Sequence, residues 1–179
     1  MNPPTPGTLR IRIKKGGDGN VTSFALHRSD GTFTVQRNVH PFFPVHDLTH
    51  YAVETTLRHR RGFYGLVAEG WNFEDFGQPW PRGHIPDDSA PAELIVGFLD
   101  LERATGIVMQ LDEFNEKIDD YFRQHTGRAS GVRLTEDNLV RIRTTIQRLA
   151  ARWHAVPPGQ TMELDYVAGA DAPEVMHDR

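Results

Sequence analysis

Three side chains of the kinds that bind metal ions recur at intervals of four residues: His46, His50 and Glu54. Residues four apart lie one turn above each other on an α-helix, so the three would line a single stripe. Two imidazoles at this spacing can offer two nitrogen ligands to one ion, and a carboxylate can complete the set. The pattern predicts a divalent-metal site, with Zn²⁺ as the expected ion, and leaves the substrate open.

The stretch from 44 to 61, PVHDLTHYAVETTLRHRR, has the features of a helix that would carry these ligands. A proline suits its first turn, and a run of arginines suits its negative C-terminal end. At about 100° per residue, His46 and His50 share an arc with Val53 and Leu57. We therefore expect both imidazoles to point into the protein.

Asp47, between the two histidines, has two interpretations. The positive end of a helix favours a carboxylate early in the helix, and this structural role is the one we prefer. The alternative is a catalytic role in the predicted site. The stripe of His46, His50 and Glu54 has a non-catalytic interpretation as well, because buried polar side chains are commonly hydrogen-bonded and can fix how helices pack.

The next segment, FYGLVAEGWNFEDFG, is expected to form a second short helix that pairs with the first. Its glycines weaken a helix but allow two backbones to approach closely. If the chain reverses near Arg61, Glu69 faces His50 and Glu54. Glu69 is therefore a fourth predicted metal ligand, and a simple hydrogen bond to a histidine is its alternative role.

Residues 72–90 form a long stretch rich in aromatic residues and proline, and loops of this length are often lids or binding loops. Its residues Trp80, Arg82 and His84 could cover a pocket, although we favour a loop that is pinned onto the body of the protein. His84, and His40 before the first helix, are candidates for a catalytic acid or base. The reason for considering them is that they are close in sequence to the other predicted site residues.

Alternation of apolar and polar residues predicts strands at 9–14, 21–28, 32–37 and 162–166. The first three should form an antiparallel meander, and the last should join the same sheet. About five helices are expected between them, which gives an α+β fold, a small antiparallel sheet packed with a helical layer.

Three of these helices lie in the second half of the chain. The first is predicted to start near Pro91, to end at Gly106 and to bury Leu94, Phe98 and Leu101. The second is expected from Asp112 to Gly127, and the third follows a cap at Thr135.

With 179 residues, of which 38% are hydrophobic, the chain can form one core, so we expect a single domain over 1–179 with loose termini at 1–7 and 168–179. A net charge of −4 gives no field that attracts nucleic acid. The absence of cysteine excludes disulfides and thiolate metal sites, and it fits a cytoplasmic protein. No apolar run approaches the ~20 residues that a membrane span needs.

The run His46-Asp47-Leu48-Thr49-His50 resembles the HDxxH helix motif of a metal-binding family of coenzyme Q biosynthesis proteins. The resemblance implies a divalent ion on His46 and His50. In that family a glutamate follows twelve positions after the second histidine, and here that position is Gly62, so Glu54 or Glu69 would have to substitute. The resemblance covers five residues and does not extend to the sheet. The longer run HDLTHYAVE is similar to runs in small bacterial proteins, which implies no activity.

Two functions are consistent with these residues. The first is a metal-dependent hydrolase or lyase, in which His46, His50 and a carboxylate hold an ion with one position open for water. The second is a non-catalytic protein in which the same side chains form a buried polar network. It would bind a partner through its sheet or through the loop at 72–90.

Overall fold

The computed structural model describes residues 7–18, 21–39 and 43–170. Within them the chain has an α+β fold, as predicted, with a four-stranded antiparallel sheet and a layer of helices. The strand order β3-β2-β1-β4 confirms that the C-terminal strand joins the N-terminal meander. The strands are β1 (Thr8–Lys15), β2 (Val21–Arg28), β3 (Phe33–Val39) and β4 (Thr161–Val167).

β1 lies inside the sheet and pairs with both β2 and β4. Its apolar side chains are buried, whereas Arg10 and Arg12 point to the opposite face. There Arg10 pairs with Asp165 at 3.0 Å and Arg12 with Glu163 at 2.8 Å, both on β4. The alternation in the sequence thus gives a sheet with one face on the core and one polar face.

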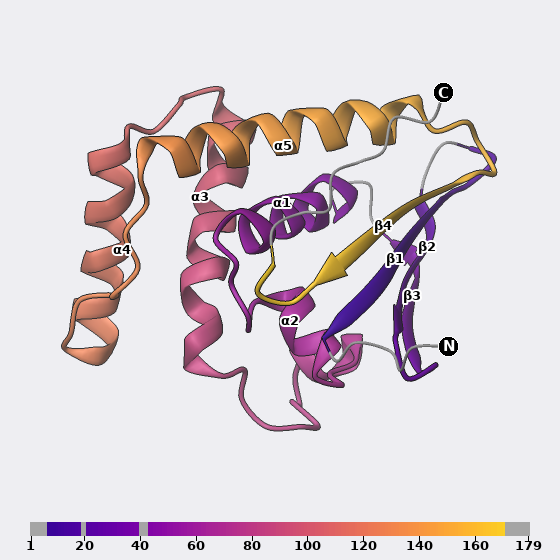
Figure 1. Cartoon of the computed structure of the whole chain (residues 1–179), viewed down its shortest axis with the longest axis horizontal. Helices are drawn as coiled ribbons and strands as arrows, with labels where there is room; N and C mark the ends of the chain where they lie inside the picture. The colour runs from indigo at the N-terminus through magenta and orange to yellow at the C-terminus, as the bar shows by residue number, and fades with distance from the viewer. Residues whose placement is uncertain (1–6, 19–20, 40–42, 171–179) are drawn as a thin grey trace.

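The helices cover the apolar face of the sheet (Figure 1). α1 lies in the middle of the molecule, between the sheet and α3. α5 runs alongside α1 and also contacts it. The α-helices are α1 (Phe43–Thr56), α2 (Phe63–Ala68), α3 (Ala90–Thr105), α4 (Leu111–Thr126) and α5 (Glu136–Ala155), and the short 3₁₀ helices are η1 (Phe73–Phe76) and η2 (Asp87–Ser89).

Because α1 is central, it contributes to two hydrophobic cores. Leu48 and Tyr51 belong to the core on the sheet side. Ala52 and Val53 belong to the core formed with α3, α4 and α5. A helix packed on both sides leaves little of its surface for solvent, so polar residues on α1 need partners inside the protein.

The bounds of α1 correct the prediction for 44–61. The helix begins at Phe43, so no acidic residue lies in its first turn, and the preferred role of Asp47 at the helix start is wrong. The helix ends at Thr56, before the arginine run, and Arg58 has a left-handed backbone with φ of 50°. The chain must turn at this point to place α2 against α1, and that tertiary packing ends the helix early.

α3 has the predicted bounds but not the predicted buried face. Ile95, Val96 and Leu99 are buried, whereas Leu101 is 53% exposed. The buried face is rotated because α3 packs against α1 as well as α4, and the partly buried Phe98 contacts Phe114 on α4. α4 and α5 have the predicted bounds, and Thr135 caps α5 as expected.

The stretch 72–90 lies on the body of the protein, as we favoured. Arg82 donates a hydrogen bond to the carbonyl of Gly70 and stacks over the ring of the buried Trp71. Asp75 caps η1 through the backbone N–H of Asn72. These contacts pin the loop.

Most of the predicted loose termini, 1–6 and 171–179, lie outside the described residues. Gly7 and Ala168, which were included in those termini, are joined by a backbone hydrogen bond of 2.9 Å and so continue the β1–β4 pairing. Among the described residues, no helix has the length and apolar character needed to cross a membrane.

Candidate functional site

His46 is held by a carboxylate from α3. Its Nδ1 lies 2.6 Å from Oδ2 of Asp100, and Asp100 also accepts a hydrogen bond from Arg103 at 2.9 Å. Burial raises the pKa of Asp100, but the hydrogen bonds from His46 and Arg103 outweigh it, so the pKa is lowered overall. Because an ionised Asp100 can only accept, Nδ1 of His46 is the donor in this contact.

His50 lies deeper, with its ring centroid 4.8 Å from that of His46. Its Nδ1 is 3.6 Å from Oε1 of Glu54, and its Nε2 is 3.7 Å from Oε2 of Glu93. The buried Nδ1 makes no hydrogen bond within the described structure. Burial lowers the pKa of His50, but Glu54, Glu93 and Asp47 more than offset it, and the pKa is raised overall.

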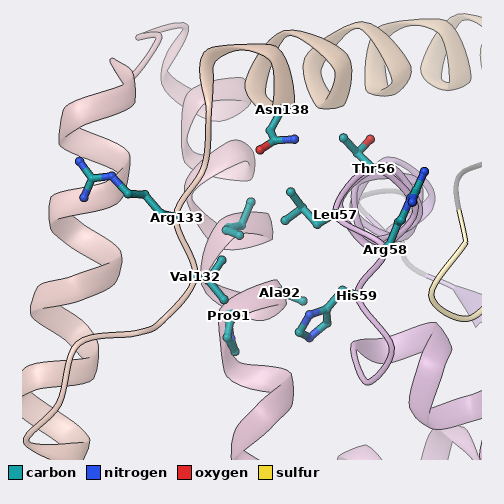
Figure 2. A pocket seen from close by; sticks show the side chains of 10 residues that line it. Thr56, Leu57, Arg58, His59, Pro91, Ala92, Val132, Arg133 and Asn138 are labelled. Carbon is teal, nitrogen blue, oxygen red and sulfur yellow. The ribbon is translucent and has the colours of Figure 1, made fainter.

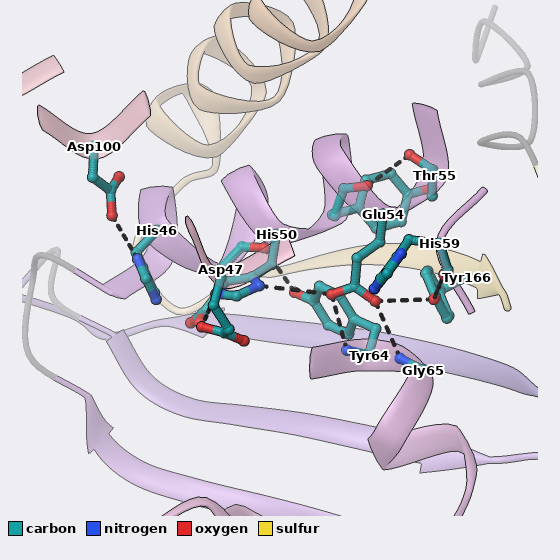
Figure 3. Close-up of polar contacts among 12 residues, drawn as sticks. His46, Asp47, His50, Glu54, Thr55, His59, Tyr64, Gly65, Asp100 and Tyr166 are labelled. Carbon is teal, nitrogen blue, oxygen red and sulfur yellow. Dashed lines mark hydrogen bonds and ion pairs between the residues drawn. The ribbon is translucent and has the colours of Figure 1, made fainter. Parts of the chain in front are cut away.

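Glu54 is fully buried, and its carboxylate joins three elements (Figure 3). It accepts hydrogen bonds from the backbone N–H groups of Tyr64 and Gly65 in α2, both at 3.2 Å. It also accepts one from the hydroxyl of Tyr166 in β4 at 3.0 Å. These bonds satisfy the buried carboxylate, so its evident role is to fasten α1 to α2 and the sheet.

Two glycines allow the close pairing of α1 and α2, as the sequence predicted. A Cβ atom at Gly62 would lie 2.7 Å from Cγ of Glu54, and one at Gly65 would overlap the carbonyl oxygen of Arg60. In the family that the HDxxH run resembles, the glutamate stands at the position of Gly62. Here the side chain of Glu54 fills the space that a side chain at that position would need.

Glu69 does not face the histidines, which corrects the predicted geometry. It lies at the C-terminal end of α2, with its side chain 45% exposed, and pairs with Arg61 at 3.1 Å. The six-residue α2 is too short for the symmetric hairpin that we assumed, so Tyr64 and Gly65 face Glu54 instead.

Asp47 is buried on α1 beside the histidines. Burial raises the pKa of its carboxyl group to about 8, His50 lowers this pKa and Asp100 raises it. The side chain therefore belongs to the cluster around His50 and not to a helix cap. A catalytic role for Asp47 stays a prediction.

His84 lies apart from this cluster in its interactions. It is exposed, and its ring packs at a tilt of 49° against Trp80, with centroids 4.5 Å apart. None of the contacts in the described part of the chain joins it to His46 or His50. The other acid–base candidate, His40, lies outside the described residues.

Asp100 and Glu93 are the site residues that the sequence reasoning missed. Both are on α3, and only the fold brings this helix to the histidines. An acidic residue directly after the apolar run VGFL was the available signal for Asp100.

Within residues 7–18, 21–39 and 43–170, no three His, Cys, Asp or Glu side chains converge closely enough to hold a metal ion. Comparison with known proteins adds no relative, because no family model, curated protein or solved structure matches this chain. The function must therefore be argued from the side chains themselves.

Proposed function

We propose that this protein binds a divalent metal ion, Zn²⁺ foremost, through His46 and His50. Nδ1 of His50 only faces Glu54, at 3.6 Å and without a hydrogen bond. The observation that carries the proposal is the hydrogen bond of 2.6 Å between Nδ1 of His46 and Asp100. Metal-binding histidines commonly have this arrangement, because the carboxylate fixes the ring and makes the other nitrogen a better ligand.

Glu93 is the third ligand in this proposal. Its Oε2 is 3.7 Å from Nε2 of His50, which is too long for a hydrogen bond. Two ligands that each lie 2.0–2.2 Å from an ion in a tetrahedral site stand about 3.4 Å apart. Because the Glu93 side chain is 46% exposed, its carboxylate can move without disturbing the core. Glu54 and Glu69, the ligands expected from the sequence, are committed to other partners.

The charges around the two imidazoles also favour a cation. Asp47, Glu54, Glu93 and Asp100 all interact with one or both histidines or with each other. Arg103, bound to Asp100, is the basic side chain beside them. With Asp47 largely protonated at neutral pH, Glu54, Glu93 and Asp100 supply the negative charge that a cation would face here.

We further propose a hydrolase or lyase activity for the loaded site. A divalent ion supplies Lewis-acid chemistry, the polarisation of a carbonyl, a phosphoryl group or water. Asp100 would orient His46, and Asp47 would hold a proton beside the site.

The competing proposal is a non-catalytic protein with a buried polar network. It is favoured by the three hydrogen bonds of Glu54, which join α1, α2 and β4 without an ion. On this proposal the cluster fixes packing, and function lies in binding a partner elsewhere on the surface.

Metal analysis of the native protein separates the two proposals. We expect near-stoichiometric divalent metal in the wild type and its loss in the double variant His46→Ala/His50→Ala. His84→Ala is the matched control, since it removes an exposed imidazole and should keep the metal. A metal-free wild type that shows no Zn²⁺ binding in calorimetry and no gain in melting temperature would establish the packing role instead.

A further inference from the structure

A cavity of about 290 Å³ lies apart from the histidine cluster, where the end of α1, the start of α3 and the loop before α5 meet (Figure 2). Its apolar lining comes from Leu57, Val132, Ala92 and Ile95. Ala92 and Ile95 are almost fully covered, so Leu57 and Val132 supply the apolar surface that a ligand could touch. The volume is at the lower end of the range for small-molecule sites. A ligand that filled it would therefore present a short apolar group to this lining.

Every ionisable side chain that lines the cavity is basic: Arg58, His59 and Arg133. Figure 2 shows His59 and Asn138 on opposite sides of the apolar lining, with the two arginines on the flanking walls and their guanidinium groups turned outward. Long arginine side chains can swing across such a rim, so the cavity offers positive charge at its edge and apolar contact within.

Two helix beginnings lie beside the cavity, and that of α5 also carries Glu136 and Asp137 in its first turn. Ala92 lies in the first turn of α3, and Asn138 in the first turn of α5. The N-terminal ends of helices carry partial positive charge. The acidic residues near the start of α3 are directed to other partners, because Asp88 pairs with Arg61 and Glu93 lies beside His50.

The backbone at Arg58 forms the C-terminal cap of α1, because the N–H of Arg58 donates to the carbonyl of Thr55 and the N–H of His59 to that of Glu54. Its φ of 50° is left-handed, a conformation that glycine or asparagine normally takes just after a helix. An arginine there costs about 1 kcal/mol. The cap places the Arg58 side chain at the rim of the cavity.

A second cavity, of about 530 Å³, lies on the other flank of α3 and has the opposite charge. Its only ionisable side chains apart from Tyr121 are Asp87 and Glu93. Each cavity has some apolar residues in its lining, and the two differ in the charge of their ionisable side chains. This difference in charge would select ligands of opposite sign.

We propose that the cavity between α1, α3 and α5 binds a small amphiphilic anion, a carboxylate or phosphate monoester with a short apolar tail. The tail packs on Leu57 and Val132, and the anionic group lies at the rim, where Arg58 and Arg133 close over it with charge-assisted hydrogen bonds. Asn138 adds an amide. This site does not depend on the proposed metal site.

Calorimetric titration of the full chain with octanoate, octyl phosphate and the uncharged 1-octanol tests the proposal. We expect the two anions to bind and octanol to bind at least about tenfold more weakly. The variant Arg58→Gln/Arg133→Gln should lose at least about tenfold in octanoate affinity. Arg60→Gln/Arg128→Gln, which neutralises two exposed arginines outside the cavity, should bind like the wild type.

A further variant, Val132→Phe, fills the cavity from its loop wall and should abolish binding of both anions while the protein still melts cooperatively. His46→Ala/His50→Ala should bind octanoate normally, which separates this proposal from the metal site. Absence of anion binding by the wild type, equal affinity for octanol, or unchanged octanoate affinity in Arg58→Gln/Arg133→Gln would each overturn it.

Discussion

Glu54 and Glu69 have the same functional group, and the fold places them in opposite environments. Glu54 is fully buried and accepts three hydrogen bonds, two of them from backbone N–H groups. Glu69 is half exposed and pairs with Arg61 in solvent. An exposed ion pair adds little to stability, whereas a buried carboxylate holds its donors in place.

Replacing each glutamate by glutamine should therefore have unequal effects. In Glu54→Gln the amide NH₂ would replace one carboxylate oxygen and face the N–H donor of either Tyr64 or Gly65, and we expect a loss of about 2–4 kcal/mol in the free energy of unfolding. Glu69→Gln is the matched control, with a change below about 0.5 kcal/mol. Urea titration measures both. Equal effects would contradict the described packing of α2.

Asp47 makes stability depend on pH. Burial raises its pKa from 3.8 in the unfolded chain to about 8, so the folded state holds the proton more tightly. The contribution of Asp47 to stability is therefore lost as the pH rises between these two values. In the presence of a chelator, Asp47→Asn should be more stable than the wild type at pH 9, by about 1–3 kcal/mol. The difference should shrink toward pH 4, and a difference independent of pH would contradict the burial.

At the scale of elements, the turn that joins α1 to α2 depends on a glycine contact between Gly65 and Arg60. Gly65→Ala should lower the free energy of unfolding by about 2–4 kcal/mol, because its Cβ would overlap the carbonyl of Arg60. Gly97, inside α3, has open space around the same atom. Gly97→Ala should therefore raise stability by about 0.5–1 kcal/mol through helix propensity. Opposite signs in thermal melts are the expected result, and destabilisation by both would contradict it.

The elements also show what the sequence alone could predict. The strands and α5 follow from period-two alternation and from the cap at Thr135, which are local signals. The end of α1 and the place of Glu69 depend on how α2 packs, and no local pattern encodes that packing. Asp100 was missed for the same reason, because it reaches His46 from 54 residues away.

At the scale of the whole molecule, β4 is the strand that joins the C-terminal part of the chain to the N-terminal sheet. It pairs with β1, and Tyr166 on it reaches Glu54 while the backbone carbonyl of Asp165 accepts a hydrogen bond from Tyr51 at 2.9 Å. The last strand in the chain thus supports the helix that carries both histidines. The site is assembled only when the two ends of the chain have come together in the sheet.

Two neighbouring residues of β4 provide the test of this closure. Leu164 is 6% exposed and faces the core, whereas Asp165 lies on the polar face and pairs with Arg10. Leu164→Lys would bury a charge without a partner, so we expect a loss of several kcal/mol or aggregation. Asp165→Lys removes only an exposed ion pair and places like charges opposite each other, with a loss of about 1 kcal/mol or less. Melting temperature and light scattering measure both, and Leu164→Lys with wild-type behaviour would show that β4 does not close the core.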